Sequence, residues 1–148
     1  MTTQIRKATI EDLDQLSTLF DSYRVFYKKQ SNVNEAKLFL TSRLTLNDST
    51  ILVAETAKVL VGFTQLYPSF SSTQMKPLLI LNDLFVNSNY RSNGISKLLI
   101  ENAKQIAKAT SSSGLMLETE KSNTIGNQLY PSIGFELIQT NNFYFWEC

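Results

Sequence analysis

The segment Arg91-Ser92-Asn93-Gly94-Ile95-Ser96 combines residue types and a position that suit the binding of an anion. It follows the apolar run Leu78–Val86, which is typical of a buried strand, and leads into Gly94–Ala109, where apolar residues recur at helical spacing. Unpaired backbone N–H groups converge at such a helix N-terminus, and the helix dipole favours negative charge there. Gly94 lets a phosphate approach the backbone closely, and Arg91 can add a charge-assisted contact.

The same segment would also suit an ordinary turn between a loop and a helix. It lacks the Gly-Lys-Ser/Thr of a Walker loop and the three glycines of the dinucleotide-binding fingerprint. A phosphate site is therefore a prediction that needs support from other parts of the chain.

The composition limits the chemistry that the chain can perform. Among its 148 residues there is no histidine and a single cysteine, Cys148, at the last position. Ser-His-Asp triads, Cys-His dyads, imidazole-bound zinc and intramolecular disulfides are therefore excluded, and we expect no metal. The net charge of +1, from 14 basic and 13 acidic residues, lacks the basic footprint of a nucleic-acid-binding protein.

Nothing in the sequence predicts a membrane protein or an exported one. The N-terminal residues lack the apolar core of a signal peptide, and no apolar run approaches the roughly 18 residues that span a bilayer. We therefore expect a cytoplasmic protein without a membrane partner.

The hydrophobic patterning predicts one mixed α/β (α+β) domain over residues 1–148. Its central sheet should be largely antiparallel, with about six to seven strands flanked by about four helices. Helices are expected from Ile10 to about Tyr23 and over residues 34–46, 94–109 and 123–130, and strands over residues 51–55, 59–67, 78–86, 114–119, 133–138 and 143–146. A polar loop is expected over Ser69–Gln74, after Pro68.

Two motifs about thirty residues apart give the anion-binding segment a family context. Arg91–Ser96 resembles the R/Q-x-x-G-x-G/A loop of the GNAT N-acetyltransferase superfamily, which in that family wraps the pyrophosphate of acetyl-CoA. Asn123, Leu129-Tyr130 and Gly134-Phe135 resemble the family pattern N-x-x-A-x-x-L-Y-x-x-x-G-F, with Gly126 in place of the alanine. The resemblance covers essentially the whole chain and is similar in detail to the histone- and polyamine-acetyltransferase-like subgroup.

The resemblance implies an N-acetyltransferase that moves an acetyl group directly from acetyl-CoA to a primary amine of a small molecule or peptide. No covalent enzyme intermediate and no metal would be needed. It implies cofactor contacts from Phe85, Val86, Arg91, Ser92, Asn93, Gly94, Ile95, Ser96 and Asn123. Asn123 would equally suit the N-cap of the following helix, and both roles are compatible. A catalytically silent acyl-CoA-binding sensor and a transferase for longer acyl groups are the alternatives.

Tyr130 is the expected general acid in this scheme. The intrinsic pKa values of a phenol and a thiol lie within about two units, so a tyrosine can pass a proton to a departing thiolate. Asp83 is the candidate base, with Asn82 and Glu118 as rivals. Strand alternation allows only one of Asn82 and Asp83 to face the acceptor, and a structural hydrogen bond is an equally valid role for Asp83.

Aromatic side chains could supply the acceptor site. Tyr23, Phe26, Tyr27, Tyr67 and Tyr144 could hold an ammonium group by cation–π contact, although ordinary packing would also explain them. Phe143–Trp146 reads as an apolar edge strand, which a homodimer or an internal hairpin would cover.

Overall fold

The computed structural model describes residues 2–148, which form two compact units. The first unit extends to Leu117 and contains the sheet, and the second unit is Glu118–Cys148. Arg91–Ser96 and Asp83 lie in the first unit, whereas Asn123 and Tyr130 lie in the second. None of the helices in residues 2–148 is long and apolar enough to cross a membrane.

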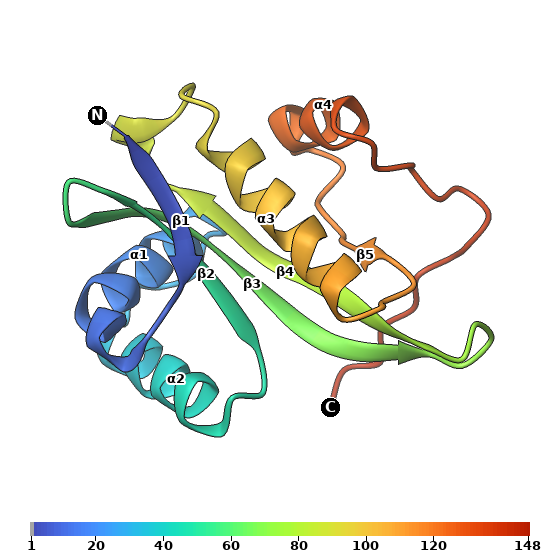
Figure 1. The fold of residues 1–148 in the computed structure, drawn as a ribbon, viewed down its shortest axis with the longest axis horizontal. Coiled ribbons are helices and arrows are strands. Elements are labelled where there is room, and N and C mark those ends of the chain that lie inside the picture. The colour runs from blue at the N-terminus through green and yellow to red at the C-terminus, as the bar shows by residue number, and fades with distance from the viewer. Residues whose placement is uncertain (1) are drawn as a thin grey trace. The chain divides into compact units, whose positions relative to one another are not determined.

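The first unit contains a five-stranded sheet with the strands in sequence order (Figure 1). The strands are β1 (Thr3–Lys7), β2 (Thr50–Thr56), β3 (Val59–Ser71), β4 (Lys76–Val86) and β5 (Leu115–Met116). Strands β1 to β4 pair antiparallel, and only β5 is parallel to its neighbour. This arrangement confirms the mixed, largely antiparallel fold class, with five strands instead of six to seven.

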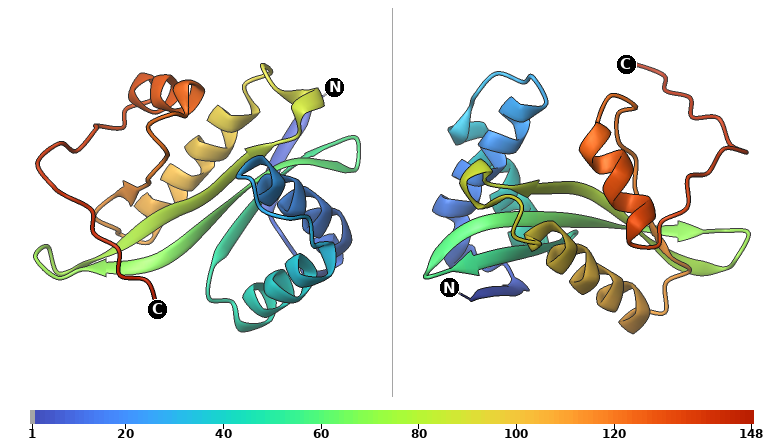
Figure 2. Two further views of the ribbon diagram at one scale, coloured as in Figure 1. Left: turned by 180° about the vertical axis from the view of Figure 1, so that it is seen from behind. Right: turned by 90° about the horizontal axis from the view of Figure 1, so that it is seen from above.

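Helices cover both faces of this sheet (Figure 2). The helices α1 (Leu13–Phe26), which follows the 3-10 turn η1 (Ile10–Asp12), and α2 (Val33–Leu46) pack on one face, and α3 (Ile95–Ala109) packs on the other. Phe63 and Phe85 point towards α1 and join its Leu16 and Phe20 in one buried cluster. Because strand residues alternate between faces, Gly62 instead points towards α3, where Ile95 lies against it.

The β3–β4 hairpin is longer than its sequence suggests. The loop expected over Ser69–Gln74 begins later, after Ser71, because β3 continues through Pro68 to Ser71 and pairs with β4 over this stretch. Leu79, which pairs with Pro68, donates its N–H to Gly114 O on the β5 side (3.3 Å) and not to β3. In an antiparallel pair of this kind the backbone groups of both residues face away from the partner strand. The Pro68 nitrogen therefore faces the edge beyond the end of β2, where a missing N–H removes no ladder bond.

A bulge interrupts the same hairpin. Gln65 pairs with Asp83 and Leu66 pairs with Leu81, which leaves Asn82 as an extra residue on β4. Bulges bend a strand locally and re-aim its side chains, and they are frequent beside active sites. This bulge places Asn82 in solvent and the neighbouring Asp83 in the interior, 5% exposed.

The second unit contains one helix, α4 (Thr124–Ser132), with Asn123 at its N-cap. The strands expected at 133–138 and 143–146 are not present in the described residues. Phe135 donates its N–H to Tyr130 O (3.0 Å) and Gly134 adopts φ 98°, so the helix end uses the backbone that would begin the first of them. Phe143–Trp146 is exposed, as is Cys148, and its burial in a homodimer stays a prediction.

Candidate active site

The loop before α3 adopts a backbone conformation that gathers N–H groups. Gly94, the N-cap of α3, has φ 75° and ψ 11°, and Ser92 has φ 64°. Alternation of left-handed residues with right-handed or extended ones is typical of backbone concavities that bind anions. A glycine takes this conformation at little cost, but a serine takes it less readily, so the surroundings must hold Ser92 in place.

The N–H groups of this loop and of the first turn of α3 are available to a ligand. The first bonded backbone N–H of α3 is that of Leu98, which donates to Gly94 O (3.1 Å). Within residues 2–148, no hydrogen bond is found from the backbone N–H groups of residues 92–97. These free donors lie at the positive end of a fifteen-residue helix and fit a pyrophosphate group.

Side chains of the loop mostly stabilise the loop itself. Asn93 donates from Nδ2 to Tyr90 O (3.0 Å) and to Arg91 O (3.3 Å). Ile95 is buried, so it can offer a ligand only its backbone, and Ser96 is half-buried. Arg91 turns back towards β4, where its Nε donates to Val86 O (2.9 Å).

An open strand edge lies beside this loop. Within residues 2–148, strand β5 pairs with Leu79 and Ile80 alone, and β4 then continues to Val86 with no further strand beside it on that side. Asn87 donates its N–H to Val61 O on β3 (2.8 Å). Backbone groups of successive residues in a strand face alternate sides, so those of Leu84 and Val86 face the open edge. The backbone groups of Phe85 face β3, so they are not directed at a ligand on this edge. The edge fits an extended amide-containing arm, which can add to it as a strand would.

A buried polar network surrounds Asp83. Gln65, which is fully buried, donates from Nε2 to Asp83 Oδ2 (2.6 Å), and Asn82 donates from Nδ2 to Oδ1 (3.1 Å). The hydroxyl of Tyr23 lies beside this carboxylate and donates to the backbone oxygen of Asn82 (3.5 Å). Ser49 donates to Gln65 Oε1 (2.8 Å), which orients the Gln65 amide so that its NH₂ group faces Asp83.

Burial and charge change the pKa values of this network. Burial raises the pKa of Asp83, and the neighbouring polar groups of Gln65, Tyr23 and Asn82 partly oppose that rise. Burial, together with the Asp83 charge, raises the pKa of Tyr67 to about 12 and that of Tyr23 further. Both phenols therefore stay protonated at neutral pH, and no cation forms an ion pair with Asp83 in the described residues.

The second unit brings together the residues of the second motif. Asn123 Oδ1 accepts the N–H of Gly126 (3.1 Å), and its Nδ2 donates to Thr119 (2.8 Å). The structure thus confirms the N-cap role of Asn123, whose polar atoms are both used within the unit. The ring of Tyr130 also lies close to Gly126, and it packs against Phe135 with 5.8 Å between the ring centroids.

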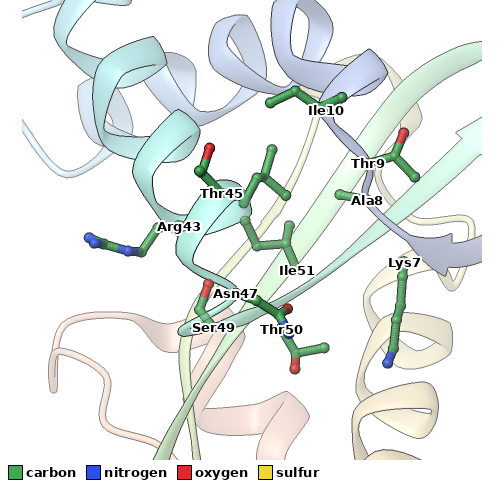
Figure 3. A pocket seen from close by; sticks show the side chains of 11 residues that line it. Lys7, Ala8, Thr9, Ile10, Arg43, Thr45, Asn47, Ser49, Thr50 and Ile51 are labelled. Carbon is green, nitrogen blue, oxygen red and sulfur yellow. The ribbon is translucent and has the colours of Figure 1, made fainter.

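A shallow pocket of about 230 Å³ lies elsewhere, between the end of β1 and the end of α2 (Figure 3). Lys7 and Arg43 lie at opposite sides of it, and Asn47 and Ser49 contribute polar groups. None of the residues that the sequence predicts for the site lines this pocket. Its link to the site is Ser49, which bonds Gln65.

Sequence reasoning missed two members of the Asp83 network. Gln65 stands in an apolar strand opposite Asp83, and a polar residue in such a run was the available signal. Tyr23 was expected in the acceptor site only for its aromatic ring, and nothing in the sequence indicated that its hydroxyl lies beside Asp83. Of the rival bases, Asn82 is exposed beside Asp83, and Glu118 lies exposed in the second unit.

Comparisons with known proteins agree with this geometry. The Acetyltransferase (GNAT) family matches residues 13–135. The "Uncharacterized N-acetyltransferase YhfO" of Bacillus subtilis (strain 168) is 42% identical over 132 residues, 89% of each chain. A crystal structure of "a probable acetyltransferase" superposes with a TM-score of 0.92 at 37% identity, covering 98% of this chain and 97% of the other.

A more distant structure shares the fold alone. AAC(6')-Iy in complex with the bisubstrate analog CoA-S-monomethyl-acetylneamine is 20% identical, with a TM-score of 0.82 over the full length of both chains. The free N–H groups before α3, the open edge of β4 and the family match over most of the chain lead to one conclusion. The chain belongs to the GNAT family of acyl-CoA-dependent N-acetyltransferases.

Proposed function

We propose that the chain transfers an acetyl group from acetyl-CoA directly to a primary amine of a small molecule or peptide. The observation that carries this proposal is the set of free backbone N–H groups over residues 92–97, beside the open β4 edge. The N–H groups would hold the pyrophosphate. The backbone of Leu84 and the N–H of Val86 would hold the amide-containing arm, since Val86 O already accepts from Arg91 Nε. The bound group supplies an activated thioester, so the chain itself needs no nucleophile and no acyl-enzyme.

Tyr130 is proposed as the general acid. When the amine attacks and the carbon–sulfur bond breaks, the sulfur leaves with the bonding electrons and needs a proton. A phenol can supply it, and a neutral residue in this position leaves the thioester undisturbed before attack. This role requires the two units to work as one domain over residues 1–148, which is part of the proposal.

Asp83 is proposed as the group that receives the proton of the amine. Its carboxylate already accepts hydrogen bonds from Gln65 and Asn82, and a carboxylate has about four lone-pair positions, so it can accept a further bond. The raised pKa brings it closer to the working range of a base. An ammonium group would also compensate the buried charge, which has no cation of its own.

Tyrosine rings near Asp83 support an amine acceptor. The ring centroids of Tyr23 and Tyr27 lie 5.1 Å apart, and the charge of Asp83 acts on both Tyr23 and Tyr67. Aromatic faces and a carboxylate together attract ammonium groups. The amine-bearing analog bound by AAC(6')-Iy, which shares the fold, is consistent with such an acceptor.

The test is a turnover screen with acetyl-CoA over polyamines, amino acids, aminoglycosides and lysine-containing peptides, with release of the coenzyme A thiol as the readout. We expect thiol release with at least one amine class. Binding of coenzyme A without thiol release across the panel would favour a catalytically silent acyl-CoA-binding sensor. Thiol release only from longer acyl-CoA thioesters would favour a transferase for longer acyl groups.

The Tyr130→Phe variant tests the acid. Removal of the hydroxyl should lower kcat by about a hundredfold, the lower range for a positioned general acid, because the thiolate must then leave unprotonated. The Kd for coenzyme A, measured by calorimetry, should stay unchanged because the ring is retained. Full turnover in this variant would remove Tyr130 from the mechanism.

A further inference from the structure

We infer that Arg91 is a positioning residue and is not itself a phosphate ligand. It would anchor the loop over residues 91–94, here called the phosphate loop, to the end of α1. The inference rests on the proposed phosphate site, and it assigns a role in cofactor binding to Phe26, a residue of α1 that does not belong to the loop.

The contacts of Arg91 are with β4 and with the end of α1. Its Nε donates to Val86 O at the end of β4 (2.9 Å), which uses the donor nearest the stem of the side chain. Its Cζ lies 5.4 Å from the ring centroid of Phe26 and 5.4 Å from that of Phe85. The guanidinium thus contacts two rings whose centroids are 6.3 Å apart, one from α1 and one from β4.

The two rings that contact Arg91 differ in how deeply they are buried. Phe85 is buried, 9% exposed, and remains packed without it. Phe26 is 55% exposed at the last position of α1, so it is free to hold the guanidinium without being part of the core. Loss of the Phe26 ring would therefore loosen Arg91 without disturbing the fold.

The phosphate loop needs an anchoring side chain because its backbone conformation is not intrinsically favoured. Ser92, the residue after Arg91, is a non-glycine residue at φ 64°. Asn93 bonds only to carbonyl groups of the loop itself, at Tyr90 and Arg91. Among the described residues, the side-chain hydrogen bonds and ring contacts that connect residues 91–94 to β4 and α1 are those of Arg91.

The Nε–H and the face of the guanidinium are already engaged in these interactions. A lysine would satisfy a phosphate as a point charge, but it has no planar guanidinium to cover two rings and no Nε–H near its stem. A phosphate ligand at residue 91 would not depend on the Phe26 ring, so the two roles make opposite predictions for Phe26→Leu.

The experiment measures the Kd of the full-length chain for coenzyme A by calorimetry, with acetyl-CoA kinetics alongside. Phe26→Leu, Arg91→Gln and Arg91→Lys should each weaken binding by about two- to fivefold, the range for an exposed cation–π contact. The Phe26→Leu/Arg91→Gln double variant should be no weaker than Arg91→Gln alone, because both changes remove the same anchor. KM for acetyl-CoA should rise while kcat is retained.

Phe39→Leu is the matched control. It removes a ring from beneath another arginine, Arg43, whose Cζ lies 4.8 Å from the Phe39 centroid on α2. This change should leave the Kd for coenzyme A unaltered. Circular dichroism melting of each variant checks that the exposed ring at residue 26 is not needed for folding.

Two results would overturn the inference. Full affinity in Arg91→Lys with a loss in Arg91→Gln would identify a phosphate ligand, as would an unaltered Kd in Phe26→Leu. Failure of the parent chain to bind coenzyme A would instead overturn the proposed function, and the inference with it.

Discussion

At Gly126, a missing side chain decides how Asn123 and Tyr130 are placed. A Cβ built there would lie 2.5 Å from Asn123 Nδ2, 3.0 Å from its Cγ and 3.2 Å from Tyr130 Cε2. The family pattern has alanine at this position, and in this chain the Asn123 side chain occupies the space of that methyl group. The departure in sequence thus has a local structural reason, which the pattern alone did not reveal.

We therefore expect Gly126→Ala to lower kcat clearly and to change the free energy of unfolding only slightly. Alanine gains roughly 1 kcal/mol of helix propensity over glycine, which offsets part of the clash in the free energy of unfolding. The displaced Asn123 or Tyr130 should nevertheless reduce kcat by about tenfold, because small displacements of reacting groups are costly. Gly114→Ala, where a Cβ would meet nothing within 4 Å, is the control. Unchanged kcat in Gly126→Ala would contradict this reading.

Asp83→Asn separates a catalytic from a structural role of the carboxyl group. Because burial raises its folded pKa, the contribution of Asp83 to stability is full below the unfolded pKa and is lost as pH rises through the folded value. At neutral pH the amide removes a buried charge, but its NH₂ group would face the NH₂ group of Gln65 or Asn82. We therefore expect a loss of about 1–3 kcal/mol in urea titrations. Loss of the base should lower kcat/KM for the amine by about a hundredfold and remove the acidic limb of its pH profile. An equal loss of stability and activity would identify a structural residue.

At the residue scale, the sequence predicted what local rules determine. Gly94 at the start of α3 and Asn123 as the N-cap of α4 follow from their positions next to helices, and the structure shows both. The bond between Gln65 and Asp83 could not be predicted, because it depends on the register of two strands and on the bulge at Asn82. A one-residue shift in that register would turn both side chains to other partners.

At the scale of elements, the contact between β3 and α3 brings the phosphate loop to the sheet. A Cβ at Gly62 would lie 3.0 Å from Phe85 O, 3.2 Å from Val86 Cγ2 and 3.5 Å from Ile95 Cγ2. The first turn of α3 can therefore approach the end of β4 only because residue 62 has no side chain.

Gly62→Ala should weaken both the fold and cofactor binding. Overpacking of this kind costs typically about 1–3 kcal/mol in the free energy of unfolding, which urea titration would detect. The same displacement of Val86 and Ile95 should raise the Kd for coenzyme A several-fold in calorimetry. Retained affinity in a destabilised variant would show that the loop keeps its position independently of this contact.

Element boundaries were predictable where a period was clear. The amphipathic repeat located α3 from Ile95 to Ala109 within one residue. Strand β5 is shorter than the expected 114–119, and β3 runs past Pro68, because edge positions are decided by which neighbour is present. Turn residues and prolines do not carry that information.

At the scale of the whole molecule, one ion-pair network connects β1, η1 and β2 and gives stability a pH dependence. Arg6 donates to both oxygens of Asp12 (2.8 Å each) and to Glu55 (3.0 Å). The hydrogen bond from Arg6 holds the pKa of Asp12 below its usual value. The stabilisation is therefore present above the unfolded pKa and is lost as pH falls through the folded pKa.

Urea titrations of the parent chain and of Asp12→Asn across acidic to neutral pH would measure this effect. We expect the parent to be more stable by roughly 1–3 kcal/mol at neutral pH, the range for hydrogen bonds to charged groups. The difference should shrink as Asp12 is protonated. A difference that does not change with pH would assign the stabilisation to packing.

The free N–H groups of the phosphate loop also bear on the deamidation of Asn93. Asn93 precedes Gly94, whose backbone nitrogen has no hydrogen-bond partner in residues 2–148. Attack of that nitrogen on the Asn93 amide carbon releases ammonia, and water then opens the ring to a carboxylate. A negative charge would then stand beside the phosphate donors and repel the cofactor. The bonds of Asn93 Nδ2 to Tyr90 and Arg91 hold the amide in place and slow this chemical loss of function.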